Sequence, residues 1–482
     1  SSVAVGVSAG NNTQGGNATA VGDRAGRDNQ GASATAIGNS AGTTSQGALS
    51  VAVGYSAGNN TQGDNAVAIG RSAGSQSQST LSVAVGMQAG QITQGTTAVA
   101  IGYRAGESTQ GESGTAVGFG AGLTSQALGG TALGYKAGQT AQGTQAVAVG
   151  YLSGLTDQGA AAIAVGESAG KTTQGGNAVA VGVNAGKTTQ GISTVAVGYS
   201  AGASLQDANS VAVGRSAGQT TQSDNSVAVG SSAGNNTQGT NSVAVGVNAG
   251  KTTQGGYAVA IGRSAGLTTQ GQSAIAVGNL AGNATQAESA VAVGNSAGQT
   301  GQGGNAVSVG IYAGQTSQGG SAVAIGNSAG KTSQASYAVA VGYLSGNTGQ
   351  LGNSVAVGRS SGTTDQAINA VAVGYVAGES AQGAQSVAIG YQAGRYTQSS
   401  NSVAIGSNAG RNSQGSNGII ISSTGAALDD TTAGHIHIAS SLGELAFTSA
   451  TGWTLDGNAI VTADVVAAST DFADFKARVA AL

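Results

Sequence analysis

The segment VAVGYSAGNNTQGDNAVAIGRSAG, residues 51–74, contains the same pattern twice. The motif Val-Ala-Val-Gly at residues 51–54 returns at residues 67–70 as Val-Ala-Ile-Gly, and the sequence Ser-Ala-Gly follows it both times. The period of sixteen persists without insertion or deletion from Gly6 to Gly406, which makes 26 consecutive copies. Such a strict period indicates a repeat architecture, in which each unit packs only against its neighbours.

Each unit is predicted to form one coil of a parallel β-solenoid, so the fold class is all-β. The Val-Ala-Val core alternates large and small side chains, a period of two that is typical of a β-strand. The following Gly supplies one corner, and x-x-Thr-Gln-Gly supplies a second turn. Because stacked coils lie about 4.8 Å apart, 26 coils would extend about 125 Å. We expect Val and Ile to fill the inside of the coils and the Ala column to face another chain.

The composition favours a repeat protein over a domain with a conventional core. Gly accounts for 87 of 482 residues, Pro and Cys are absent, and only 4% of the residues are aromatic. So few large side chains cannot build a core of Leu and Phe, and the absence of Cys excludes disulfides. The net charge of −3 gives no support to nucleic-acid binding. No apolar run approaches the roughly 20 residues of a membrane helix, so we expect no membrane insertion.

One Gln occupies the same position in every copy of the repeat. A side-chain amide in each coil would hydrogen-bond the amides above and below, as in other stacked strands. The alternative is a linear track that binds a ligand. We predict a structural ladder that includes Gln14, Gln62, Gln238 and Gln414. The preceding column is mostly Thr or Ser, which would suit an ice-binding face, but Asp157 and Leu205 interrupt it.

The position after the strand Gly varies most, which indicates exposure to solvent. Several copies carry Tyr there and others carry Arg. A stripe of this kind would bind a glycan or a protein, or would be only a solubilising outer edge. The candidate surface-binding residues include Tyr55, Tyr103, Tyr135 and Tyr151.

The repeat resembles a known family. Ser-Val-Ala-Val-Gly, and Asn-Ser-Val-Ala-Ile-Gly at residues 401–406, are similar to the head repeats of trimeric autotransporter adhesins. Similar repeats occur in the fibres of bacteriophages and large viruses. The resemblance covers residues 1–422 and implies a β-roll in a homotrimer, with small residues where the chains meet. The unit here is longer than the adhesin head repeat, and its Ala-Gly-x-x-Thr-Gln-Gly half is different.

The period breaks near residue 422, which predicts three regions. Residues 1–422 form the solenoid, with 26 repeats and one degenerate copy. Residues 423–468 form a tip of short strands that supports trimerisation. Residues 469–482 form a terminal amphipathic helix, because polar N-cap residues precede apolar residues at a and d spacing. The trimerisation residues of this helix would be Phe472, Phe475, Val479 and Leu482.

Both histidines of the chain lie in the tip. The segment Gly434–Ile438 alternates, so His435 and His437 are expected on one face of a strand. In a trimer, three such pairs would offer six imidazoles on the axis to one ion, Fe or Zn. The segment resembles the His-x-His metal motifs of phage tail-fibre tips. The alternative is a solvated strand face. The adjacent acids Asp429 and Asp430 are predicted to form a turn.

The scattered charges form no acid–base cluster, so we expect no enzyme activity. We expect a structural fibre of a virion, such as a bacteriophage tail or appendage fibre, that gives a rigid rod for host attachment. Its partners would be two further copies of the chain, other virion proteins, and a host receptor or glycan. The alternatives are a trimeric adhesin on a bacterial cell surface and an ice-binding solenoid.

Overall fold

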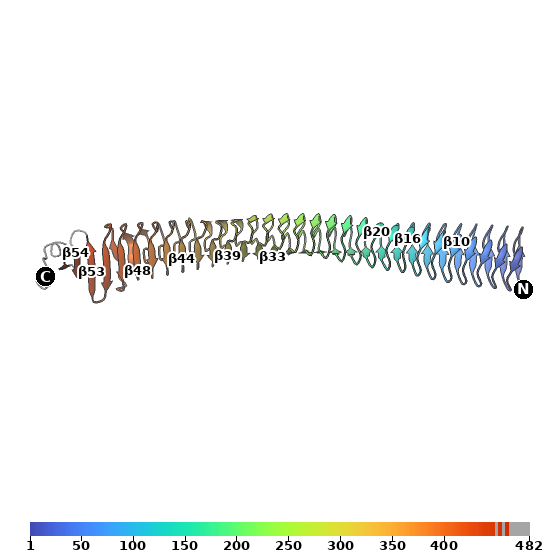
Figure 1. Ribbon diagram of the computed structural model, residues 1–482, viewed down its shortest axis with the longest axis horizontal. Coiled ribbons are helices and arrows are strands. Elements are labelled where there is room, and N and C mark those ends of the chain that lie inside the picture. Colours follow the sequence, from blue (N-terminus) through green and yellow to red (C-terminus); the bar gives the residue numbers. More distant parts are fainter. Residues whose placement is uncertain (449–451, 456–457, 462–482) are drawn as a thin grey trace, which may run out of the picture. The chain divides into compact units, whose positions relative to one another are not determined.

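A computed structural model describes residues 1–448, 452–455 and 458–461. Every element in these ranges is a β-strand, and they contain no helix, so none that could cross a membrane (Figure 1). The chain divides into two compact units, Ser1–Asn248 and Ala249–Leu482. The helix expected at residues 469–482 lies outside the described residues.

The Val-Ala-Val segments form one column of parallel strands in each unit, and we call them the valine strands. In the first unit they begin with β1 (Val3–Val5) and recur every sixteen residues through β31 (Val243–Val245). In the second unit they begin with β33 (Val259–Ile261) and recur through β46 (Val387–Ile389), before the longer β48 (Val403–Gly406). Each strand pairs in parallel with the next at a spacing of sixteen residues, as in Val51↔Val67.

The Thr-Gln segments form a second column, and we call them the glutamine strands. In the first unit they run from β2 (Asn12–Gln14) to β30 (Thr237–Gln238), and each ends at the repeated Gln. In the second unit they run from β32 (Thr253–Gln254) to β42 (Thr332–Gln334) and resume at β47 (Thr397–Gln398). Isolated bridges at Thr348, Thr364 and Ser380 continue the column between them. The predicted parallel β-solenoid with one coil per sixteen residues is therefore confirmed within each unit.

The inside of the coils is lined by alanine, which corrects the expectation that Val and Ile fill it. Ala52, in the middle of its valine strand, is 0% exposed, whereas Val51 and Val53 on either side are partly exposed. Ala57 of the Ala-Gly motif is equally buried, and the two alanine columns pack together. The Ala column therefore does not face another chain. The physical reason is space, since a sixteen-residue coil must also enclose a Gln side chain.

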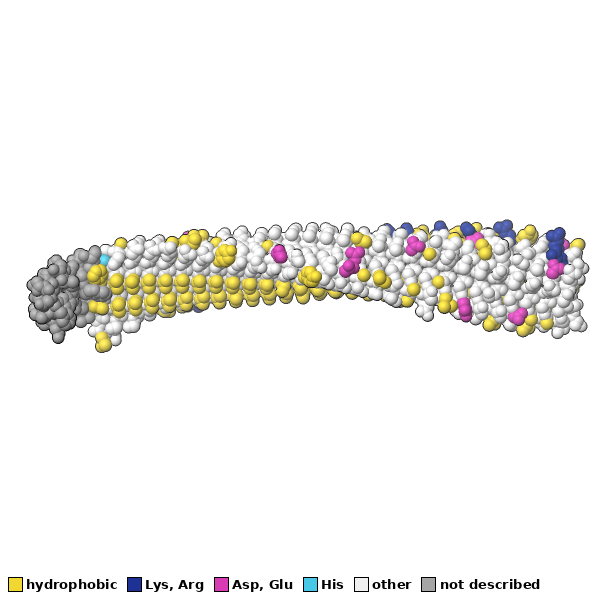
Figure 2. Space-filling view, viewed as in Figure 1, with side chains coloured by type: hydrophobic (Ala, Val, Ile, Leu, Met, Phe, Trp, Pro, Cys, Tyr) yellow, Lys and Arg dark blue, Asp and Glu magenta, His cyan; other side chains and the backbone are white. Residues whose placement is uncertain are grey.

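The valine strands direct their larger side chains outward instead. Figure 2 shows two parallel rows of hydrophobic side chains along coils of the second unit. The first and third positions of the valine strands are the partly exposed ones, as in Val323 and Ile325, and we call these two columns of side chains the apolar face. In all 26 copies these two positions hold only Val, Ile, Leu or Thr.

The turn before the repeated Gln has two backbone forms. Where the preceding residue is small or acidic, its φ is in most coils between 50° and 55°, as in Ser45, Ala141 and Asp157. Where it is Thr, most glutamine strands are shorter by one residue, as in β22 (Thr173–Gln174). β-Branched side chains disfavour the left-handed region, which accounts for the difference. Thr13 and Thr61 are exceptions, with φ of 52° and 58°.

The parallel stack continues beyond the last sixteen-residue repeat. The degenerate copy forms β50 (Ile419–Ser422), which pairs in register with β48. It then pairs in parallel with β52 (Ile436–Ser440), at a spacing of seventeen residues. β53 (Gly443–Thr448), β54 (Gly452–Leu455) and β55 (Asn458–Val461) follow as an antiparallel meander. Residue 422 thus marks the end of the period, while parallel pairing persists to Ala439.

Candidate metal centre and repeated surface columns

The repeated Gln lies inside the coil, where it satisfies backbone groups and forms a ladder. Gln62 Nε2 donates to Val51 O at 2.9 Å and Ala66 O at 3.3 Å, and to Gln78 Oε1 in the next coil at 3.1 Å. The side chain is only 2% exposed. Gln14 and Gln414 make the corresponding contacts to their own coils, and Gln238 donates to Val227 O at 2.7 Å.

The amide ladder has interruptions. The Oε1 atoms of Gln46, Gln62, Gln126 and Gln190 are buried and accept no hydrogen bond within the described structure. The Nε2 contact to a valine-strand carbonyl persists at each of these four residues. The hydrogen bond from Gln Nε2 across the coil to a valine-strand carbonyl is therefore more regular than the bond between amides of successive coils. The sequence predicted the ladder but not the bond across the interior.

The Gly of Ala-Gly leaves the space that this Gln amide occupies. Gly58 has φ of 50°, and a Cβ atom there would lie 2.8 Å from Gln62 Oε1. Both the positive φ and the close amide exclude a larger residue. Gly and Gln are thus both invariant because each requires the other.

The tyrosine column is exposed, and it is partly stacked. Tyr103, Phe119, Tyr135 and Tyr151 occupy four successive coils, with ring centroids 5.0, 5.1 and 5.2 Å apart. Each ring covers the face of the next, so the column presents ring edges and hydroxyl groups to solvent. Tyr55 lies in another part of the column and is 60% exposed. Phe119 belongs to the stack, although only tyrosines are predicted from the sequence as surface-binding residues.

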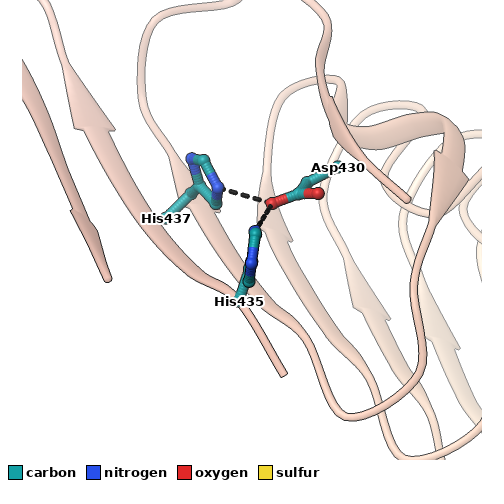
Figure 3. Close-up of side chains that lie close together, drawn as sticks. All are labelled: Asp430, His435 and His437. Carbon is teal, nitrogen blue, oxygen red and sulfur yellow. Dashed lines mark hydrogen bonds and ion pairs between the residues drawn. The ribbon is translucent and has the colours of Figure 1, made fainter. Parts of the chain in front are cut away.

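Two histidines and one aspartate converge at the end of the parallel stack. β51 (Leu428–Asp430) ends at Asp430, and β52 carries His437, with His435 directly before it. Asp430 Oδ2 lies 2.7 Å from His435 Nδ1 and 2.6 Å from His437 Nε2. The three side chains point toward one another and are largely buried, with 14–16% of each exposed (Figure 3).

Neighbouring groups orient this cluster. His437 Nδ1 contacts Glu444 Oε1 of β53, and the Thr432 amide donates to Asp430 Oδ1 at 2.8 Å. Burial raises the pKa of Asp430, but the hydrogen bonds from the Thr432 amide and the two histidine rings together outweigh it. The pKa of Asp430 is therefore lowered, and its carboxylate is stabilised in the charged form.

No protein-family model, curated protein or solved structure matches the chain.

His435 and His437 are expected on one face of a strand, and both rings contact the same carboxylate. The role of Asp430 is not predicted by the sequence, where the residue is expected only in a turn. The feature of the sequence that could have indicated Asp430 is the adjacent acidic pair Asp429 and Asp430. The two carboxylates have different partners in the structure. Asp429 Oδ1 accepts from the Asn412 amide at 2.7 Å, whereas Asp430 turns toward the histidines. The terminal-helix residues that are predicted to support trimerisation lie outside the described residues. They are Phe472, Phe475, Val479 and Leu482.

Proposed function

We propose that the chain is a structural fibre protein whose copies associate side by side, in parallel, through the apolar face. The observation that carries this proposal is the size of that face. In the first unit, sixteen valine strands spaced about 4.8 Å apart give a strip about 70 Å long and about 10 Å wide, on the order of 700 Å². Soluble monomers rarely expose contiguous apolar patches larger than a few hundred Å². A specific interface buries about 800 Å² on each partner, which is a similar area.

The assembly we propose is a homotrimer. The apolar face has two columns of side chains, so in a threefold arrangement each column would contact one of the two neighbouring chains. The absence of charge from both columns in all 26 repeats favours burial in such an interface. This interface differs from the one expected from the sequence, because the alanine columns are buried inside the coil and cannot contact another chain.

The setting we propose is a virion, as a bacteriophage tail or appendage fibre that holds the host-binding parts away from the particle. The support is the resemblance of the repeats to those of fibre proteins. A stack of coils is suited to this role because adding coils lengthens it without changing its cross-section.

The test is the mass of the chain in solution by sedimentation equilibrium. A double variant, Val181→Asp with Val197→Asp, places two charges on the apolar face in adjacent coils. The matched control, Thr173→Asp with Thr189→Asp, places the same charges on exposed glutamine-strand positions of the same two coils. We expect a trimer for the unmodified chain and the control, and dissociation toward monomer for the valine variant. A monomeric unmodified chain, or a trimer in all three proteins, would contradict the proposal.

A further inference from the structure

We propose that Asp430, His435 and His437 of a single chain bind one divalent transition-metal ion, with Zn²⁺ as the reference ion. The three ligand atoms, Asp430 Oδ2, His435 Nδ1 and His437 Nε2, all lie within 4.8 Å of one another. Zn²⁺ bound to nitrogen and oxygen at about 2.0–2.1 Å places tetrahedral ligand atoms about 3.3 Å apart. The carboxylate oxygen is now 2.6–2.7 Å from the two ring nitrogens, so an ion requires each of these O–N distances to lengthen by less than 1 Å.

The surroundings of the cluster match those of metal sites in other proteins. A histidine that binds a metal generally donates its second ring N–H to a carboxylate, which fixes the ring and raises its basicity. His437 has such a partner, because its Nδ1 contacts Glu444 while its Nε2 faces Asp430. The carboxylate ligand is also held, by the Thr432 amide on its other oxygen. Metal binding would place the ion where the Asp430 oxygen now meets the two ring nitrogens, and these nitrogens bind a metal only without a proton.

The position of the cluster in the fold indicates a structural role for the ion. Asp430 ends β51, His437 lies in β52, and the supporting Glu444 lies in β53. β52 is the strand at which the sheet changes from parallel to antiparallel pairing. An ion there would link these strands where the repeated interior has ended. Three protein ligands leave a fourth position for water or another ligand.

This site differs from an axial site made of six imidazoles from three chains. In the single-chain site, Asp430 contacts one nitrogen of each histidine ring, and these two nitrogens and the carboxylate are the ligands. Each chain therefore supplies a full set of three ligands. The two arrangements predict different stoichiometries, one ion per chain against one ion per three chains. The proposal does not depend on the oligomeric state, because one chain holds all three ligands.

The experiment is equilibrium dialysis of the full, untagged chain against Zn²⁺, with bound zinc measured by elemental analysis. The two histidines of the site are the only ones in the sequence, so no other imidazole competes. Asp430→Asn keeps the size of the side chain and an acceptor for the Thr432 amide but removes the charged ligand. Asp429→Asn is the matched control, since it removes the neighbouring charge on the same strand without touching the histidines.

We expect one Zn²⁺ per chain for the unmodified protein and for Asp429→Asn, and at least a tenfold loss of affinity for Asp430→Asn. Glu444→Gln should weaken binding by about 10- to 100-fold, as loss of a group that supports a metal ligand generally does. If the ion binds at this cluster, adding Zn²⁺ should slow hydrogen exchange of residues 428–447 in the unmodified chain. Failure to retain zinc, one ion per three chains that survives Asp430→Asn, or equal loss in Asp429→Asn would each overturn the proposal.

Discussion

At the scale of single residues, the repeat depends on one buried amide and the glycine that makes room for it. Gln270 donates to Val259 O at 2.7 Å, Ala274 O at 3.1 Å and Gln286 Oε1 at 3.2 Å. These carbonyls lie in the coil interior, where an acceptor without a donor costs free energy of desolvation. One side chain thus supplies a polar partner in an interior that is lined mainly by alanine.

Gln270→Leu keeps a similar volume but removes the donor. We expect it to lower the free energy of local opening around its coil by about 1–3 kcal/mol, because Val259 O and Gln286 Oε1 lose this donor, while Ala274 O keeps the Val259 amide. Native-state hydrogen exchange resolves this coil from the rest of the repeat array, whose unfolding need not be two-state. The control is Gln272→Leu, two residues away and exposed, which should change little. Equal effects in both variants would contradict a structural role for the buried amide.

Gly266→Ala tests the other half of this arrangement. Gly266 has φ of 53°, and a Cβ there would lie 2.7 Å from Gln270 Oε1, so we expect a loss of about 1–3 kcal/mol. Gly304→Ala is the comparison, because its nearest atom would be 3.6 Å away and no left-handed φ is required. Hydrogen exchange should show destabilisation of the coil that carries Gly266→Ala and not of the coil that carries Gly304→Ala. A neutral Gly266→Ala would mean that the coil can move its amide without cost.

At the scale of the elements, the width of a coil determines which side chains a valine strand directs inward. The inward position is Ala in nearly every copy, and Ser308 is the exception. Ser308 Oγ donates to Gln318 Oε1 at 2.7 Å, so the hydroxyl is accommodated by the same amide that fills the coil. The interior therefore tolerates one added oxygen that bonds to Gln, but it offers little room for added carbon.

Ala324 in the next coil allows this to be measured. We expect Ala324→Ser to be nearly neutral, because Gln334 lies where Gln318 lies for Ser308. Ala324→Val adds two carbon atoms to a fully buried site and should cost about 1–3 kcal/mol through overpacking. Thermal or urea unfolding followed coil by coil with hydrogen exchange distinguishes the two. A tolerated Val would show that the interior is wider than its alanine lining indicates.

The end of the parallel stack should weaken in acid. The pKa of Asp430 is lowered in the folded chain, so its contribution to stability is complete above about pH 4–5, where the unfolded carboxyl is ionised. That contribution is lost as the pH falls through the lowered folded pKa. The difference in urea stability between the unmodified chain and Asp430→Asn, measured without metal, should therefore be larger at pH 5 than at pH 2.5. A difference that does not change with pH would exclude this ionisation as its cause.

At the scale of the whole molecule, stability accumulates coil by coil, because each coil buries its surface only against its neighbours. Within each unit the backbone bonds run from one coil to the next, as in Val51 N to Ala66 O at 2.9 Å. The coil stack leaves the apolar face outward, and that face is the largest feature that the repeats do not cover themselves. The predicted loss of the trimer in the Val181→Asp and Val197→Asp variant belongs to this scale, since it changes contacts between chains rather than within a coil.

The sequence by itself determined the parallel stack, because a strict period places equivalent residues in equivalent positions and Val-Ala-Val favours a strand. It also indicated the amide ladder, since one Gln per coil is a periodic signal. It did not determine which face of the valine strand lies inside, because alternation separates two faces without saying which one the coil encloses. Only the tertiary structure decided that, since the narrow interior, already occupied by Gln, has room for Ala and not for Val. The role of Asp430 likewise depended on chain folding, which brings it to His437 in β52 and to His435 directly before it. No repeated pattern in the sequence indicates this contact.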